Sequence, residues 1–442
     1  PAGVLKPIGK WPEKWADFTH EIDGHGVDAL PEDRQGENIL VNELCSLYIQ
    51  HGIEEAIDDV SGAYLDPALV KAGRILEMNY FKEMKVYERV PTTHLATTGG
   101  KLIGTMWIDT NKGDSENPNV RCRLVGKEFR TGPDDALFAS TPPLEALRLI
   151  ISRAAFLGIN GEKHEVMIND VSRAYFYAKC TRDLYMELPV EDPEAHSDFI
   201  GKLRLCPYGT RDAALNWQER VSGRLIGQGF IHGIGHPSVC HRPLRNIWTL
   251  VHGDDYVSSG TIDSMNWLEK ELTKAYEIKT QKVGIGEWYK SEGKVLNRLL
   301  RCTKDDWEME ADPRHAEFVA EQLGLNDDKG IDTSGLLGAD EDDNDEDVLL
   351  TGADITSYRG VIARCNYLAS DRPDCNFAIK EGCCEMSSPT TGSHRRLVRI
   401  GRYLKNHPRL VWRLPMPSQQ SEVIVRTDAD SAGCRRARKS TS

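Results

Sequence analysis

The sequence predicts an α+β fold, because strand-like and helix-like segments alternate irregularly along the chain. The clearest strand signal is a pair of apolar runs at residues 101–110 and 120–129, joined by a turn-rich segment, which predicts a long hairpin. The clearest helix signal is the apolar spacing over residues 144–157. With 442 residues, 40% of them hydrophobic, the chain is long enough for about two to four compact units.

The middle of the chain predicts a strand, a helix and a second hairpin. Residues 164–170 form a strand-like run that ends at Asp170. Residues 247–260 form two apolar runs around a Gly-Asp-Asp turn, which predicts a hairpin with carboxylates at its tip. A helix is predicted from Thr210, and its apolar face consists of Ala214, Trp217, Val221 and Leu225.

The C-terminal part predicts helices. An N-cap followed by proline at residues 312–313 begins a helix that ends at Gly324. Further helices are predicted over residues 355–368 and 394–404, and a strand at residues 422–430 begins a domain that we expect to be unfinished. At the other end, the first 70 or so residues have mixed composition and are interpreted as a connector or peripheral cap.

The net charge of −13 is unevenly distributed. Residues 327–347 hold ten acidic residues and one basic residue, which predicts a solvated acidic linker. Residues 391–442 hold twelve Lys and Arg against three acids, as expected where a phosphate backbone lies on the surface. The negative average therefore does not exclude a nucleic-acid partner.

The cysteines and the apolar runs indicate the compartment. The 11 cysteines are scattered without framework spacing and no signal peptide is recognisable, so we expect free thiols in an intracellular protein. The most apolar stretch, residues 146–159, contains two arginines and is shorter than the roughly 20 residues of a membrane span. No membrane partner is expected.

Three aspartates are the candidate catalytic residues. Asp170 ends one strand, and Asp254 and Asp255 lie at the tip of the second hairpin. If these elements pair, the carboxylates could hold two divalent ions about 3.5 to 4 Å apart, as phosphoryl transfer to a growing strand requires. Taken singly, an Asp at a strand end or in a turn is more simply a solvated turn residue.

The residues around these aspartates resemble polymerase motifs. The sequence DVSRAYF, with Tyr175 five positions after Asp170, resembles the first palm motif of reverse transcriptases, and the Gly-Asp-Asp hairpin resembles their third. The same hairpin is typical of viral RNA-directed RNA polymerases, where an Asp generally takes the place of Tyr175. The tyrosine favours DNA synthesis, because in reverse transcriptases this aromatic packs under the sugar and excludes a 2′-hydroxyl.

A longer series of motifs resembles copia-type LTR-retrotransposon Pol polyproteins, in the order of that family, from Ala72 to the C-terminus. The motifs are VRCRLVGKEF, STPPLEALRLII, LYMELP, PYGTRDAALNW, YRGVIARCNYLASDRPD, RYLKNHP and TDADSAGCRRARKSTS. The resemblance implies a reverse transcriptase region that runs into the start of RNase H, particle-associated in the cytoplasm or nuclear. RNase H activity itself is not expected, since only Asp428 of its acids is present.

The resemblance also implies the architecture: a right-hand polymerase with fingers, a ferredoxin-like palm and a helical thumb after about residue 288. The domains implied are an N-terminal connector at 1–84, fingers, palm and thumb at 85–325, the acidic linker at 326–350, a helical connection at 351–420 and a truncated RNase H start at 421–442.

The resemblance assigns roles to single residues. Asp170, Asp254 and Asp255 are the implied ligands of two Mg²⁺ or Mn²⁺ ions, and Tyr175 is the implied sugar gate. Contacts with the incoming dNTP are implied for Arg121, Arg123 and Lys127, for which a solvated strand face is the alternative. Contacts with an RNA or DNA template-primer are expected for Tyr208, Gly209 and Arg211. The spacing of Arg395, Arg399 and Arg402 places them on one helix face, for which template-primer contact and a solvated face are equal alternatives.

Two departures leave the activity of this copy open. His252-Gly253 stands where the family has Tyr-Val, and Asp212 stands where it has Gln. The alternatives are an inactive or domesticated remnant that binds nucleic acid, and a viral RNA polymerase. Zinc is disfavoured for His232, His236, Cys240 and His241, because they fall where the family has a loop and strand. Other parts of the same polyprotein are further candidate partners.

Overall fold

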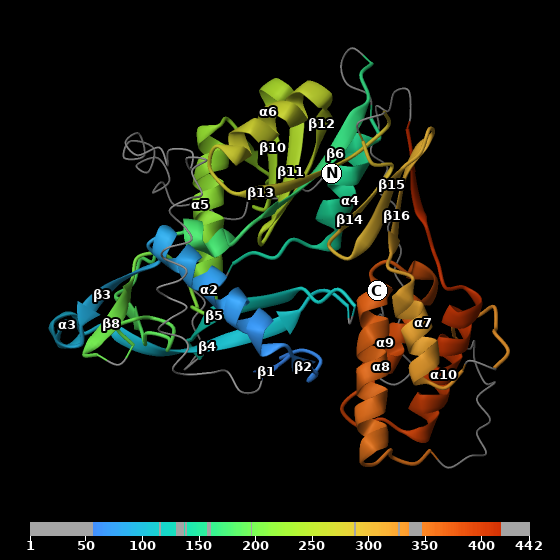
Figure 1. Ribbon diagram of the computed structural model, residues 1–442. Helices are drawn as coiled ribbons and strands as arrows, with labels where there is room; N and C mark the ends of the chain where they lie inside the picture. The colour runs from blue at the N-terminus through green and yellow to red at the C-terminus, as the bar shows by residue number, and fades with distance from the viewer. Residues whose placement is uncertain are drawn as a thin grey trace, which may run out of the picture. The chain divides into compact units, whose positions relative to one another are not determined.

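The computed structural model describes residues 56–114, 116–129, 137, 139–156, 161–195, 197–286, 289–325, 328–335 and 347–416 (Figure 1). The chain divides into two compact units, the first comprising residues 1–150 and 166–282 and the second residues 151–165 and 283–442. Both helices and strands occur in each, so the α+β class is confirmed. No helix in the described ranges is long and apolar enough to cross a membrane.

A six-stranded sheet forms the centre of the first unit. Its strands, in spatial order, are β13 (Ile278–Val283), β6 (His164–Val171), β12 (Asp255–Thr261), β11 (Ile247–His252), β10 (Val239–Arg242) and β9 (Ile231–His232). Helices α5 (Ala213–Gly227) and α6 (Ile262–Thr273) share one buried core with this sheet, built around Trp217, Tyr256 and Leu268 (Figure 1). Along the chain, β6, α5, β11, β12, α6 and β13 form a β-α-β-β-α-β unit, with spatial strand order 4-1-3-2.

A five-stranded sheet also belongs to the first unit. Its order is β3 (Tyr87–Pro91), β8 (Phe199–Leu203), β7 (Leu184–Met186), β4 (Lys101–Asn111) and β5 (Val120–Lys127). The predicted long hairpin is β4 and β5. Helix α2 (Pro67–Glu83) packs on β5, where Phe81 and Leu124 share a core and Val70 contacts the core around Cys122. The smaller elements here are β1 (Ala56–Ile57), β2 (Tyr64–Leu65), α3 (Thr93–Thr98), η4 (Ala174–Tyr177) and η5 (Pro243–Arg245).

The second unit contains a four-stranded sheet and a helical group. The sheet order is β14 (Glu292–Val295), β15 (Arg298–Cys302), β16 (Asp306–Ala311) and β17 (Trp412–Pro415). The helices are α7 (Arg314–Gln322), α8 (Ala353–Ala369), α9 (Pro373–Cys384) and α10 (Thr391–Asn406), packed around Ile362, Ile379 and Leu404.

Helix α4 (Leu144–Ala154) lies where the sequence predicts a helix and ends three residues earlier.

The helical thumb expected from about residue 288 does not begin there. Strands β14 to β16 come first, and α7 begins at Arg314. The turn between β14 and β15 places Leu296 at φ 44° and Asn297 at φ 59°, the left-handed pair of a tight hairpin. Leucine is rarely found in that region, so the turn has no recognisable sequence signal.

The domain boundaries expected from the sequence stay predictions. Within the expected connector, the described residues 56–83 form β1, β2 and α2 and contribute to the core of the first unit. Residues 1–55 of the expected connector, most of the acidic linker, and the strand predicted at 422–430 lie outside the described residues.

Candidate active site

The three candidate aspartates come together at one end of the six-stranded sheet. Asp170 lies near the end of β6, and Asp254 and Asp255 lie at the β11–β12 turn. Because β6 and β12 are neighbours, the backbone N–H of Val171 donates a 2.9 Å hydrogen bond to the carbonyl oxygen of Asp254. The pairing that the candidate site requires is therefore present, although 84 positions separate the two segments.

The hairpin tip is a two-residue turn. His252 and Asp255 are paired, which leaves Gly253 and Asp254 as the central residues. Gly253 adopts φ 61°, a conformation that glycine supplies without steric cost at the first central position of a hairpin turn. The indole Nε1 of Trp217 on α5 donates a 2.7 Å hydrogen bond to the carbonyl oxygen of Gly253. A core residue of the neighbouring helix therefore holds the turn that carries the carboxylates.

The site carries uncompensated negative charge. Burial, together with the nearby negative charges of Asp254 and Asp170, raises the pKa of Asp255 to about 6. None of the three forms an ion pair with a described Lys or Arg. In the described ranges, no three His, Cys, Asp or Glu side chains are already gathered into a group that could hold a metal ion unaided.

Tyr175 lies beside these carboxylates in η4. Arg173, just before it, adopts a left-handed φ of 51°, which turns the chain from β6 into this short helix. The ring centroid of Tyr175 is 4.9 Å from that of Tyr208. Burial raises the pKa of Tyr175, and the nearby negative charge of Asp254 contributes to the same shift.

The three basic residues expected at the nucleotide have different surroundings on β5. Arg123 is half-buried, and its guanidinium lies 4.6 Å from the centroid of the Tyr208 ring. Arg121 and Lys127 are exposed. All three alternate onto one face of the strand, since they are separated by even numbers of residues. Arg123 therefore lies next to the Tyr175–Tyr208 pair, and the solvated-face alternative stays open for the other two.

Gly209, one of the residues expected at the template-primer, lies very close to the backbone of Gly126. Gly209 adopts φ 85°, and a Cβ built on it would lie 2.1 Å from the carbonyl oxygen of Gly126 on β5. The N–H of Gly126 donates a 2.8 Å bond to the carbonyl oxygen of Tyr208. The backbone N–H of Arg211 donates to Glu128 Oε2 at 2.9 Å. The segment that begins α5 is thus fastened to the β4–β5 hairpin.

Sequence reasoning missed the network that surrounds Asp212. Arg182 donates to both oxygens of Glu128 at 2.8 Å and to both oxygens of Asp212 at 2.6 and 2.9 Å. The two carboxylates are nearly inaccessible, with side chains 1% and 2% exposed. Asp212 is therefore neutralised internally, and the departure from the family's Gln does not place a free acid on the surface. Glu128 and Arg182 carried no sequence signal, because their partners are distant in the chain.

A second buried acid was also missed. Glu77 of α2 accepts a 3.0 Å hydrogen bond from Arg173, whose guanidinium lies 3.3 Å from the centroid of the Tyr80 ring. Burial raises the pKa of Glu77, and the positive charge of Arg173 opposes that shift. This ion pair connects α2 to the segment between Asp170 and Tyr175.

The remaining predicted residues lie elsewhere. Arg395, Arg399 and Arg402 are on α10 in the second unit, where Arg399 donates to Thr333 Oγ1 at 2.5 Å and Arg402 to the carbonyl of Lys329 at 2.8 Å. At least two of them thus support the local structure. Asp428 lies outside the described residues.

The disfavoured zinc residues have other partners. His232 contacts Ser222 Oγ at 2.7 Å and the carbonyl of Pro237 at 2.6 Å, while His241 stacks on Trp248 with ring centroids 4.2 Å apart.

Comparison with solved structures and family profiles gives little. No family profile matches the chain. An apo telomerase from Candida tropicalis, truncated from its C-terminal domain, aligns with a TM-score of 0.33 at 9% identity, over 56% of this chain and 62% of that one. A Candida albicans telomerase in complex with a fragment of telomeric RNA aligns with a TM-score of 0.32 at 8% identity, over 72% and 60%. Scores this low do not establish a shared fold.

Sequence comparison is more informative. The retrovirus-related Pol polyproteins from transposons RE2 and RE1 of Arabidopsis thaliana are 25% and 24% identical to this chain over 326 and 317 residues. Each alignment covers 70% of this chain, which spans about 20% of the length of either relative. The similarity to retrotransposon Pol polyproteins that the motifs predict is therefore confirmed over most of this chain.

Proposed function

We propose that this chain is an RNA-directed DNA polymerase, the reverse transcriptase of a copia-like retrotransposon, which extends a primer on an RNA or DNA template. The observation that carries the proposal is the pairing of β6 with the β11–β12 hairpin, which brings Asp170 to Asp254 and Asp255. An Asp at a strand end or a Gly-Asp-Asp turn alone has a simpler explanation. That simpler explanation does not account for the three aspartates lying together beside Tyr175 and Arg123.

The donor set suits two divalent ions. Three hard carboxylate oxygen donors, uncompensated by described basic side chains, favour Mg²⁺ or Mn²⁺. Such ions take only one or two carboxylates each and complete their shell with substrate phosphates and water, so an incomplete protein cage is expected before substrate binds. When bound, two ions would supply activation of the primer 3′-oxygen and neutralisation of the leaving pyrophosphate.

The other residues of the site position the incoming nucleotide. Tyr175 would lie under the deoxyribose, backed by the Tyr208 ring, and would exclude a 2′-hydroxyl by its bulk. Arg123, held against Tyr208, would contact the triphosphate. Arg121 and Lys127 on the same strand face would add charge around the same phosphates.

The architecture supports the same proposal. The β-α-β-β-α-β unit with strand order 4-1-3-2 has ferredoxin-like connectivity and would be the palm, with its carboxylates at the ends of the central strands. The five-stranded sheet that carries β4 and β5 would be the fingers. The second unit would supply the thumb and the helical connection, and the basic face of α10 would contact template-primer.

A primer-extension assay tests the proposal. The parent protein should extend a DNA primer on an RNA template with dNTPs and Mg²⁺, and Asp170→Asn or Asp254→Asn should reduce extension by at least about a thousandfold. Template-primer affinity should change little, because basic surfaces provide most of it. The matched control is Asp263→Asn, an exposed aspartate in the first turn of α6, which should extend like the parent.

Two outcomes would contradict the proposal. Equal extension by the aspartate variants and the parent would show that the three carboxylates are not catalytic. A parent that binds template-primer but extends with neither dNTPs nor rNTPs would favour the binding-only remnant.

A further inference from the structure

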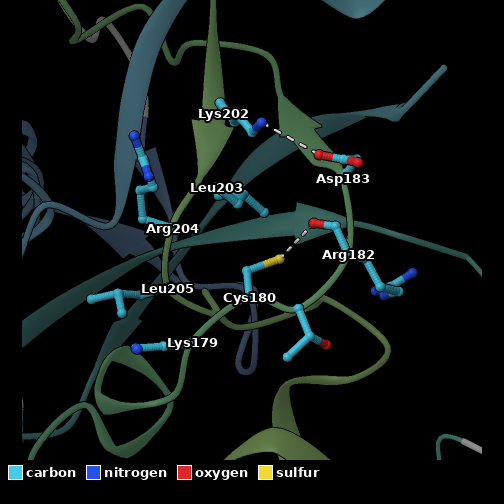
Figure 2. Close-up of a pocket in the computed structure, with 9 residues that line it drawn as sticks. Lys179, Cys180, Arg182, Asp183, Lys202, Leu203, Arg204 and Leu205 are labelled. Carbon is cyan, nitrogen blue, oxygen red and sulfur yellow. Dashed lines mark hydrogen bonds and ion pairs between the residues drawn. The ribbon is translucent and has the colours of Figure 1, made fainter. Parts of the chain in front are cut away.

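A hollow of about 460 Å³ lies in the first unit, where β7 begins and β8 ends in the five-stranded sheet (Figure 2). It is lined by two chain segments, residues 179–183 between η4 and β7, and residues 202–205 at the end of β8. The two segments are held side by side by an antiparallel bridge between Lys179 and Leu205, and by a 2.9 Å bond from Cys180 N to the carbonyl of Arg204. None of the residues discussed for catalysis lines it.

The lining is strongly basic. Four of its nine residues are cations and Asp183 is its one acid; the cations are Lys179, Arg182, Lys202 and Arg204. Lys202 lies on β8, and Arg204 follows the end of that strand. Lys179 is exposed and pairs with no acidic side chain in the described part of the chain.

The cations differ in how readily they can bind a ligand. Arg182 is fully engaged by the buried carboxylates of Glu128 and Asp212, so it lines the hollow but is not available to bind a ligand. Lys202 pairs with Asp183 at 3.3 Å, an acid whose side chain is 57% exposed. Arg204 pairs with Glu88, and both side chains are at least half exposed. Exposed ion pairs of this kind contribute little and exchange readily for a stronger anion.

We propose that this hollow binds the sugar-phosphate backbone of a nucleic-acid strand. The ligand chemistry is phosphate, recognised by Lys179, Lys202 and Arg204. No aromatic ring lines the hollow, so it offers no platform on which a base could stack. A mononucleotide would therefore leave its base unrecognised, whereas a strand needs only contacts to its backbone. The inference rests on the proposed function, because the strand would be the template or primer of that reaction.

The first test measures binding of a fluorescent single-stranded oligonucleotide, without divalent metal or nucleotide. The double variant Lys179→Gln/Arg204→Gln should bind at least about fivefold more weakly, uniformly across sequences. The plot of log affinity against log salt concentration should become shallower by about 0.7 for each lost contact. The matched control is Lys279→Gln, an exposed lysine on β13 outside the hollow, which should bind like the parent. Unchanged affinity and slope in the double variant would overturn the proposal.

A second test uses the thiol of Cys180, which lines the hollow (Figure 2). Iodoacetamide modification is followed by mass spectrometry, with the exposed Cys384 of α9 as the internal reference for reagent activity. Oligonucleotide should slow modification of Cys180 at least about fivefold in the parent and not in the double variant. No protection in the parent would contradict the proposal. Equal protection by inorganic phosphate or a deoxynucleoside monophosphate, at matched phosphate concentration, would show that the hollow binds a small phosphate ligand and not a strand.

The Asp254→Asn variant separates this inference from the proposed function. It lacks a proposed catalytic carboxylate but keeps the hollow, so its Cys180 should be protected as in the parent. Protection of Cys180 in a parent that extends no primer would leave the inference standing while the polymerase proposal fails.

Discussion

The indole Nε1 of Trp217 donates a 2.7 Å hydrogen bond to the carbonyl oxygen of Gly253, so the core of α5 holds the turn that carries Asp254. Trp217→Phe keeps an aromatic ring in the core but leaves that carbonyl without its indole partner. We expect a loss of about 1 kcal/mol of unfolding free energy and a larger proportional loss of primer extension. Urea unfolding and single-turnover extension measure the two effects.

Trp412→Phe is the matched control for this variant. Trp412 Nε1 also donates to a backbone carbonyl, that of Asp371 at 2.9 Å, but it lies in the second unit. Trp412→Phe should lower the free energy of unfolding about as much as Trp217→Phe does. It should leave single-turnover extension at saturating template-primer unchanged. If both variants lose extension in proportion to stability, the Trp217 bond has no special role at the turn.

Gly209 and Gly229 share a backbone conformation but differ in surroundings. Their φ values are 85° and 84°, yet a Cβ on Gly209 would lie 2.1 Å from the carbonyl of Gly126, while one on Gly229 would meet only the Arg242 side chain at 3.8 Å. Gly229→Ala should cost about 1–2 kcal/mol for the left-handed conformation alone. Gly209→Ala should cost at least about 2 kcal/mol more, because the backbone of β5 at Gly126 must move to admit the methyl group. Equal losses in thermal unfolding would show that the approach to Gly126 relaxes freely.

The sequence predicted the local elements well, because these depend on short-range patterns, while the catalytic role of the three aspartates stays a prediction. The β4–β5 hairpin, β6 and the Gly-Asp-Asp turn each have a local periodicity or a turn residue. What it could not predict depends on long-range pairing. Glu128, Arg182 and Asp212 come from three separate segments of the chain, and the turn at Leu296 departs from the residue preference of its type. The bond from Trp217 to Gly253 likewise joins residues whose sequence positions gave no reason to pair them.

The Glu128–Arg182 ion pair should give the stability a pH dependence at low pH. Burial raises the pKa of Glu128, but hydrogen bonds from Arg182, the Arg211 backbone and Lys101 outweigh it and lower the pKa from 4.5 to about 2. A carboxyl that is more acidic in the folded state stabilises the fold above pH 4.5 and loses that contribution as the pH falls toward 2. Glu128→Gln should therefore flatten the stability profile between about pH 4.5 and 2 and cost about 3 kcal/mol at pH 7.

The control for Glu128→Gln is Glu116→Gln, which removes one exposed negative charge from the same hairpin. Urea unfolding at several pH values should give the parent profile for this control. A Glu128→Gln profile parallel to that of the parent would show that Glu128 does not titrate in this window.

Tyr175 distinguishes a DNA-making enzyme from an RNA-making one by a steric criterion. Its ring packs beside the Tyr208 ring, with centroids 4.9 Å apart, and the charges of Asp254 and Arg123 both act on its hydroxyl. A ring under the sugar leaves no room for a 2′-hydroxyl, and discrimination of this kind needs no hydrogen bond to the correct substrate. Tyr175→Val should raise kcat/KM for rNTP relative to dNTP at least about tenfold, equivalent to about 1.4 kcal/mol of differential transition-state stabilisation.

The control is Tyr175→Phe, which keeps the ring and should keep the ratio of the parent. Both ratios are measured with matched dNTP and rNTP on one primer-template. A parent that already prefers rNTPs, or an unchanged ratio in Tyr175→Val, would make Tyr175 an ordinary core residue and would favour the RNA-polymerase alternative.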